Sequence, residues 1–160
     1  MISPSATLGT LLRRLIELLD RDVEAAYKAA GLTWRPRYTP ILRALMAEGE
    51  ASIRSISLRI GITHSAVSQT VSQMARDGMV EMRSGSDARE RIVALTSKAE
   101  AMIPALRRQW AATNAAANEL DAELSAPLSK VAAEAIEALT QRAFRDRIKH
   151  AEAKAPQTQP

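Results

Sequence analysis

The sequence predicts a mainly α-helical protein in which a compact head with one small β-hairpin lies between long N- and C-terminal helices. Apolar residues recur every three or four positions over most of the chain, which is the helical period. Aromatic residues make up only 3% of the chain, so the core must consist of Leu, Ile, Val and Ala, which favours helix against helix. Two short strand-like runs, residues 79–83 and 91–96, interrupt this pattern.

The length of 160 residues and the 46% hydrophobic content fit a single domain, expected over residues 1–151 and followed by a disordered tail over 152–160. A first helix is expected over residues 6–30, ended by Gly31, and a shorter one over 39–48. The apolar positions of these helices are Leu8, Leu11, Leu12, Leu15, Leu19 and Val23 in the first, and Ile41, Leu42 and Leu45 in the second.

The middle of the chain shows two short helices joined by a tight turn. Ser52 can cap the first helix, Gly61 can end it, and Thr63 can cap the second. A small residue at Ser57, glycine four residues later and the apolar Val67 six residues after that form the spacing of a helix-turn-helix. The apolar faces consist of Ile53, Ile56 and Ile60 in the first helix, and Val67, Val71, Met74 and Gly78 in the second.

The other face of the second helix carries hydroxyls and amides in place of the Lys and Glu that usually solvate a helix. Such short groups can bond base edges and phosphate oxygens, so this face favours DNA reading in a major groove. An ordinary polar surface helix is the alternative interpretation. The candidate DNA contacts are Ser65, Ser68, Gln69, Ser72, Gln73 and Arg76 on this face, with Thr63 and His64 at the helix start.

The hairpin carries arginines that suit the minor groove of DNA. Its two runs flank a turn over residues 84–87. A narrow minor groove concentrates negative potential, and a long guanidinium on a hairpin tip can probe it. We expect Arg83, Arg89 and Arg91 to cluster there as DNA contacts, with Asp87 orienting Arg89 or stabilising the turn. An ordinary solvated hairpin is the alternative.

Together these motifs make nearly the whole chain resemble the MarR family of bacterial winged helix-turn-helix transcription regulators. The resemblance rests on the helix-turn-helix, on Asp87 and Arg89 in the wing, and on the Leu95-Thr96 pair before the next long helix. It implies that Ser68 and Gln69 read the major groove and that Arg89 enters the minor groove.

Two more helices are predicted after the wing. Ser97 and Glu100 suit a capping box that begins a helix running across Pro104 to an alanine-rich stretch near residue 117. A last helix begins near Ser125, with Pro127 tolerated in its first turn. Its apolar positions are Leu128, Val131, Ala135, Leu139 and Phe144.

The DNA-binding head is expected over about residues 39–96, and the helices over about 6–30 and 97–150 have more apolar surface than this head can cover. We expect them to interlock across a two-fold axis in a homodimer. Such a dimer would bind double-stranded DNA at an inverted repeat with half-sites roughly 34 Å apart. The alternative is a monomer whose helices wrap their own head.

Composition excludes several classes of function. The chain has no cysteine, so disulfides, thiolate metal sites and thiol switches cannot form. Its two histidines, His64 and His150, have no partner at catalytic or metal-ligand spacing, and no phosphate-binding loop or nucleophile motif occurs. We therefore expect no enzyme activity, cofactor or metal. Charges interrupt the N-terminal apolar run, so we expect no signal peptide or membrane span and a cytoplasmic protein.

Members of the MarR family often bind anionic aromatic compounds between the dimer helices and the head. The resemblance therefore implies an effector pocket, for which Trp34, Tyr38 and Trp110 are candidate lining residues; a role as core anchors is the alternative. Because the net charge is only +4, we expect binding to DNA to depend on specific contacts rather than on overall charge attraction. The prediction is a homodimeric repressor released by an effector, and the alternative is a winged-helix module that binds another protein.

Overall fold

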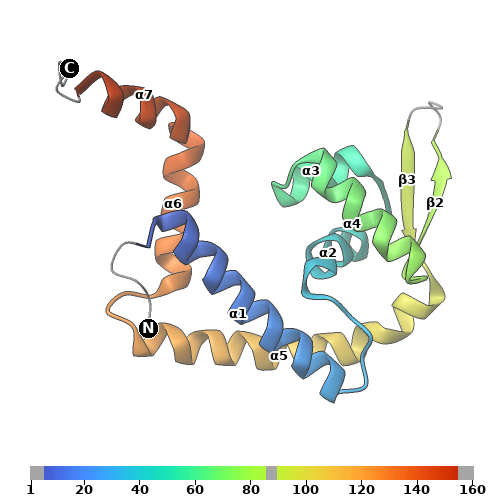
Figure 1. Ribbon diagram of the computed structural model, residues 1–160. Helices are drawn as coiled ribbons and strands as arrows, with labels where there is room; N and C mark the ends of the chain where they lie inside the picture. The colour runs from blue at the N-terminus through green and yellow to red at the C-terminus, as the bar shows by residue number, and fades with distance from the viewer. Residues whose placement is uncertain (1–5, 86–89, 155–160) are drawn as a thin grey trace. The chain divides into compact units, whose positions relative to one another are not determined.

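The computed structural model describes residues 6–85 and 90–154, and it confirms a mainly helical chain with one small antiparallel sheet (Figure 1). The chain forms two compact units, Met1–Ala111 and Ala112–Pro160. The first unit contains the sheet and the hydrophobic core, and the boundary between the units falls within helix α5 (Ser97–Glu123). Over the described ranges, no helix is both long and apolar enough to cross a membrane.

Helix α1 (Leu8–Ala29) fills most of the range predicted for the first helix. Thr7 caps it, because its side-chain oxygen accepts the backbone N–H of Thr10 at 3.3 Å. The helix ends before Gly31, whose φ of +73° lies in the left-handed region. Tyr27 is the buried residue of α1, and Leu15, Leu18 and Val23 are partly buried. Five other large apolar side chains are exposed: Leu8, Leu11, Leu12, Ile16 and Leu19.

The predicted helix-turn-helix is confirmed, and its caps lie where the sequence places them. Ser52 and Thr63 each accept the backbone N–H of the third residue on, at 3.2 and 3.4 Å. Gly61 has a φ of +68° and ends its helix. The Ser57 hydroxyl donates to the Ile62 carbonyl at 2.6 Å, which fixes the turn. The helices of this region in order are the short 3-10 helix η1 (Pro36–Tyr38), α2 (Thr39–Glu48), α3 (Ile53–Ile60) and α4 (His64–Arg76).

Strands β2 (Val80–Ser84) and β3 (Arg91–Leu95) form the predicted hairpin. The structure adds a strand that the sequence does not predict, β1 (Glu50–Ser52), which pairs with β3 to give the order β1-β3-β2. Three residues are too few to show a period of two, and β1 is defined by its pairing with a distant strand. Gly49, with a φ of +80°, turns the chain out of α2 into β1. The wing is thereby joined to the connection between α2 and α3.

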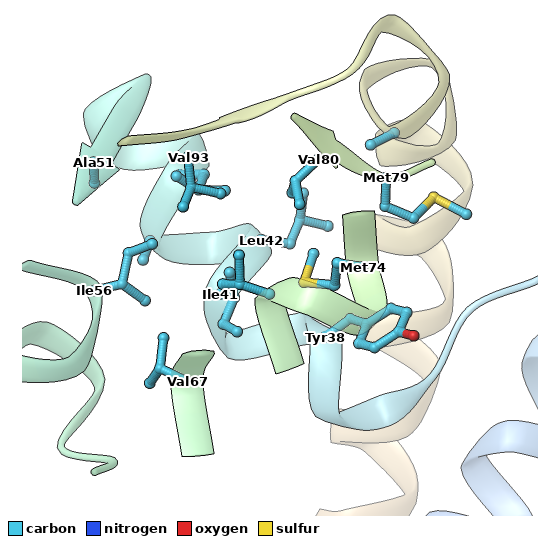
Figure 2. Packing of buried hydrophobic residues seen from close by; sticks show 14 of the residues in the cluster. Tyr38, Ile41, Leu42, Ala51, Ile56, Val67, Met74, Met79, Val80 and Val93 are labelled. Atoms are coloured by element: carbon cyan, nitrogen blue, oxygen red, sulfur yellow. The ribbon is translucent and has the colours of Figure 1, made fainter. Parts of the chain in front are cut away.

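The hydrophobic core lies between η1, the three short helices and the sheet, and Figure 2 shows their side chains converging. Val67, Val71 and Met74 bury the inner face of α4, as predicted. Leu42 of α2 is fully buried, so Leu42→Ala should cost about 2–5 kcal/mol of stability. Trp110 belongs to the same cluster, so the first part of α5 also packs on the core.

The start of α5 corrects the predicted capping box. Thr96, rather than Ser97, caps the helix, because the Thr96 Oγ1 accepts the backbone N–H three residues on at 3.3 Å. The same hydroxyl donates to the Gly78 carbonyl at 2.8 Å, which ties the helix start to the residues that follow α4. Helix α5 then continues across Pro104 to Glu123, further than the predicted end near residue 117.

The second unit contains the end of α5, helix α6 (Leu128–Gln141) and helix α7 (Phe144–Lys154). The prediction of a single last helix is wrong, because the backbone of Arg142 is extended (φ −139°, ψ 110°) and interrupts the helix. Phe144 therefore begins a separate helix. Helix α7 includes residues 152–154, which the sequence assigns to the tail, and the rest of that tail lies outside the described residues.

Candidate nucleic-acid interface

Helix α4 presents its polar residues to solvent because its apolar residues are fixed in the core. Ser65 and Gln69 are exposed, and Ser68 and Ser72 are half-buried beside them. Ser72 donates its hydroxyl to the Ser68 carbonyl at 2.8 Å, which leaves its oxygen lone pairs as acceptors. The outer face of α4 therefore offers an exposed amide and several hydroxyls within two turns.

A cleft of about 460 Å³ lies next to this face, lined by residues from the starts of α3 and α4 and from the wing. Three basic side chains from three elements line it: Arg54 of α3, His64 of α4 and Arg91 of β3. Ser68 of the polar face borders the cleft, and Glu90 contributes a carboxylate. First-turn residues of two helices meet here, and a helix start favours negative charge. The cleft therefore suits an anion such as a phosphate group.

Arg54 is a candidate contact that the sequence analysis missed. Its side chain is exposed and polar, so it adds nothing to the apolar period that defines α3. One local signal was present: Arg54 comes two residues after the cap Ser52, in the first turn of its helix. A cation at a helix start interacts unfavourably with the helix dipole, so helix stability does not explain a basic residue at this position.

The register of the hairpin separates two arginines that the sequence expects to cluster. Arg91 pairs with Ser84, whereas Arg83 pairs with Ile92. Successive residues of a strand point to opposite faces, so Arg83 and Arg91 project from opposite sides of the sheet. Arg91 shares its face with the buried Val93, toward the core helices. The predicted cluster of these two arginines is therefore wrong.

Arg83 instead forms an ion pair with Glu50 of β1. The hydrogen bond and the negative charge of Glu50 raise the pKa of the Arg83 guanidinium. Both side chains are more than half exposed, so this pair contributes little to stability. The other two predicted wing contacts, Asp87 and Arg89, lie outside the described residues.

Residues 30–90 match the model of the MarR family. This segment includes η1, all three helices of the helix-turn-helix region and the first strand of the wing. Over this segment the chain is similar to the MarR family.

Solved structures of transcriptional regulators share the fold over most of their length. A transcriptional regulator from M. tuberculosis, MosR, in complex with DNA is 23% identical, with a TM-score of 0.68 over 89% of this chain and 99% of that one. PcaV from Streptomyces coelicolor, with its natural ligand, is 21% identical, with a TM-score of 0.64 over 89% and 98%. An organohalide-sensing regulator bound to 2,4-dichlorophenol is 18% identical, with a TM-score of 0.65 over 86% and 83%. No curated protein matches the sequence.

Two predicted reading residues of α4, Gln73 and Arg76, are already bonded to each other. The Gln73 Nε2 donates to Asp77 Oδ1 at 2.9 Å, and the Gln73 Oε1 accepts from Arg76 at 2.6 Å. Asp77 Oδ2 in turn accepts the Tyr38 hydroxyl at 2.6 Å. This hydrogen bond is the largest cause of the lowered pKa of Asp77. The polar face of α4 therefore has two parts: an open part around Gln69 and a bonded part around Gln73.

The three aromatic residues predicted for an effector pocket lie in the hydrophobic core. Trp34, Tyr38 and Trp110 are 2%, 0% and 9% exposed. Trp34 Nε1 donates to the Thr39 hydroxyl at 3.1 Å, and Trp110 Nε1 donates to the Tyr27 hydroxyl at 3.1 Å. Their polar atoms are thus bonded within the chain, which is what core anchors require.

Trp34 does border a pocket of about 320 Å³. Two cations, Lys28 and Arg35, and two carboxylates, Glu24 and Asp77, line it as well, whereas Tyr38 and Trp110 are not part of this lining. Among the residues that the structure describes, no three His, Asp or Glu side chains are grouped closely enough to hold a metal ion.

Proposed function

We propose that the chain is a transcription repressor that binds double-stranded DNA as a homodimer at an inverted-repeat operator. The observation that carries the proposal is the open polar face of α4, which lies beside a cleft lined by Arg54, His64 and Arg91. Amides and hydroxyls discriminate base edges, and cations beside them fix the protein on the phosphate backbone. Side chains suited to both kinds of contact lie on one side of the head.

The roles follow from this arrangement. Ser65, Ser68, Gln69 and Ser72 face the major groove, with Gln69 as the exposed amide that can bond an adenine in two places. The cleft takes a phosphate. Thr63, which caps α4 beside the cleft, belongs to the same contact. Arg89, together with Asp87, belongs to the minor-groove contact of the wing; this part rests on the sequence and on the family resemblance.

The homodimer is proposed from apolar surface that each unit leaves uncovered. The outer side of α1 and the helices α6 and α7 expose large apolar side chains, and α6 and α7 bury none of their residues. Apolar patches of this kind mark interfaces. The side chains concerned are Leu8, Leu11, Leu12, Ile16 and Leu19 in α1, Val131, Ile136 and Leu139 in α6, and Phe144 and Ile148 in α7.

Release of DNA by a small aromatic or anionic effector completes the proposal. Two of the structures that share the fold contain small ligands. In this chain, the pocket beside Trp34, with Lys28 and Arg35 in its lining, is near the lower end of the size of small-molecule sites, roughly 300–1,000 Å³. A ligand there would act by favouring dimer geometries that do not fit the operator spacing. Thermal shift and DNA-release assays with a panel of aromatic carboxylates and phenols test this part.

The salt dependence of binding tests the phosphate contact. Arg54→Ala should weaken binding to every duplex by a similar factor and should reduce the slope of log K against log salt by about one unit. Fluorescence anisotropy across a salt series measures this slope. Arg59→Ala is the matched control, because Arg59 lies in the same helix but is paired with Glu48 at 2.7 Å. Equal slopes for Arg54→Ala and the unaltered protein would contradict the assignment of the cleft.

A further inference from the structure

A side chain from outside the helix-turn-helix holds the C-terminal end of α4. Tyr38 lies in η1, before α2, and is fully buried. Its hydroxyl donates to Asp77 Oδ2 at 2.6 Å, across 39 positions of sequence, and Asp77 is the residue that directly follows α4. The last turn of α4 is therefore bonded to the core by a short, charge-assisted hydrogen bond.

The Asp77 carboxylate collects further donors around this bond. Its other oxygen accepts the Gln73 Nε2 at 2.9 Å, and Arg35 Nε lies 3.6 Å from Oδ2. Hydrogen bonds from Tyr38 and Gln73 and the charge of Arg35 lower the pKa of Asp77, so the carboxylate is ionised at neutral pH and accepts from all its neighbours. The donors come from η1, from the loop before it and from α4, so one side chain connects three segments.

Hydrophobic packing alone leaves the direction of α4 loosely defined. Apolar contacts are non-directional, whereas hydrogen bonds hold donor and acceptor within a few tenths of an ångström. Helix α4 has 13 residues, so it is about 20 Å long, and a tilt of about 6° moves one end by about 2 Å. That distance separates a good hydrogen bond to a base from none. The side chains on the open part of α4 depend on how its far end is held.

We propose that the Tyr38–Asp77 hydrogen bond sets the direction of α4, so that Tyr38 and Asp77 are positioning residues for base reading although neither contacts DNA. The inference rests on the proposed DNA-binding function and adds to it a determinant of specificity outside the reading face. Gln73 is bonded to Asp77, and Arg76 is bonded to Gln73. Both residues therefore support the Tyr38–Asp77 hydrogen bond rather than read bases.

The experiment compares two variants that break the bond with one that breaks a similar bond elsewhere. Tyr38→Phe removes the donor, and Asp77→Ala removes the acceptor. Tyr27→Phe is the matched control: Tyr27 is also buried, at 2% exposed, and its hydroxyl accepts from Trp110 Nε1 at 3.1 Å. Among the described residues, no hydrogen bond joins this hydroxyl to Asp77. The probe is a duplex that the unaltered full-length protein selects from a randomised pool, with a scrambled duplex of equal composition as reference.

The quantity measured is the ratio of the two dissociation constants, at a temperature where circular dichroism shows every variant folded. Tyr38→Phe and Asp77→Ala should each reduce this ratio by about tenfold, and the double variant should lose little more, because both single changes break one interaction. Tyr27→Phe should lower the melting temperature and leave the ratio within about twofold. A purely structural role would instead make the ratio follow the melting temperature in both tyrosine variants.

Unchanged ratios in Tyr38→Phe and Asp77→Ala would overturn the inference, as would equal losses in Tyr38→Phe and Tyr27→Phe. Should Tyr38→Phe fail to fold, Asp77→Ala decides under the same criteria, since its side chain is 27% exposed and less critical for the core. A pool that yields no selected duplex would remove the proposed function and this inference with it. A selected duplex bound alike by all variants would remove the inference alone.

Discussion

At the scale of single residues, the two glutamines of α4 have the same side chain in different surroundings. Gln69 is exposed, with its amide open to a ligand. Gln73, one helical turn later, has its Nε2 bonded to Asp77 and its Oε1 bonded to Arg76. An amide reads a base only when both its donor and its acceptor are available. The two glutamines therefore show that a place on the polar face is not sufficient for base reading.

Gln69→Ala should cost about 1–3 kcal/mol at one base pair of the half-site and should relax the preference there. Gln73→Ala, one turn away, removes a donor to Asp77 and should reduce discrimination to a similar extent at all positions, with the preferred base unchanged at each. Selection from a randomised pool, followed by binding to all single-base variants of the selected duplex, measures both effects. A uniform loss on all sequences for Gln69→Ala would reduce this residue to a phosphate contact.

The Asp77 carboxylate predicts a pH dependence of stability. Its pKa in the folded protein is lowered from 3.8, chiefly by the Tyr38 hydroxyl, so its stabilising effect is complete above that value and is lost as the pH falls through the folded pKa. The difference in unfolding free energy between the unaltered protein and Asp77→Asn should be constant near neutral pH and should shrink in acid.

Asp20 provides the control of opposite sign. Burial, with the charge of Glu24, raises its pKa above 3.8, so the unaltered protein should gain stability relative to Asp20→Asn as the pH falls. Urea unfolding of the three proteins at several pH values measures both differences. A constant difference for Asp77→Asn down to the acid limit would contradict the role given to its hydrogen bonds.

At the scale of elements, the sequence predicts what local rules decide. Caps and glycine stops fix the limits of α3 and α4, and the period of apolar residues fixes their buried faces. Strand β1 could not be predicted, because three residues are too few to show an alternating pattern. They form a strand only because they pair with the distant strand β3. The same applies to the Arg83–Glu50 pair and to the bonded state of Gln73, which depend on register and on residues distant in sequence.

The cap of α5 shows why a local rule can choose the wrong residue. Thr96 and Ser97 both suit an N-cap, and the choice falls on Thr96 because its hydroxyl also reaches the Gly78 carbonyl. Thr96→Ala should therefore destabilise the protein by about 0.5–2 kcal/mol. Ser97→Ala, one residue on and exposed, should stay within about 0.5 kcal/mol of the unaltered protein in denaturant unfolding. A larger loss of stability for Ser97→Ala than for Thr96→Ala would contradict this assignment and would support the capping box at Ser97.

At the scale of the whole molecule, exposed apolar surface on α1, α6 and α7 predicts self-association. Leu12→Asp places a charge in the apolar stripe of α1 and should produce monomers in sedimentation experiments, because an unpaired charge is costly in an interface. Thr10→Asp adds the same side chain to α1 about 200° around the helix and should leave the association unchanged. A dimeric Leu12→Asp protein would place the interface away from α1.

The central claim is that two copies of the open face of α4 read DNA together. Selection of duplexes from a randomised pool by the purified protein, with Gln69→Ala in parallel, tests it most directly. The account predicts an inverted repeat with half-sites about one helical turn apart, roughly 34 Å, and a changed or relaxed base in each half-site for Gln69→Ala. Recovery of sequences without a shared pattern, identical for both proteins, would contradict it and would favour a protein partner for this face.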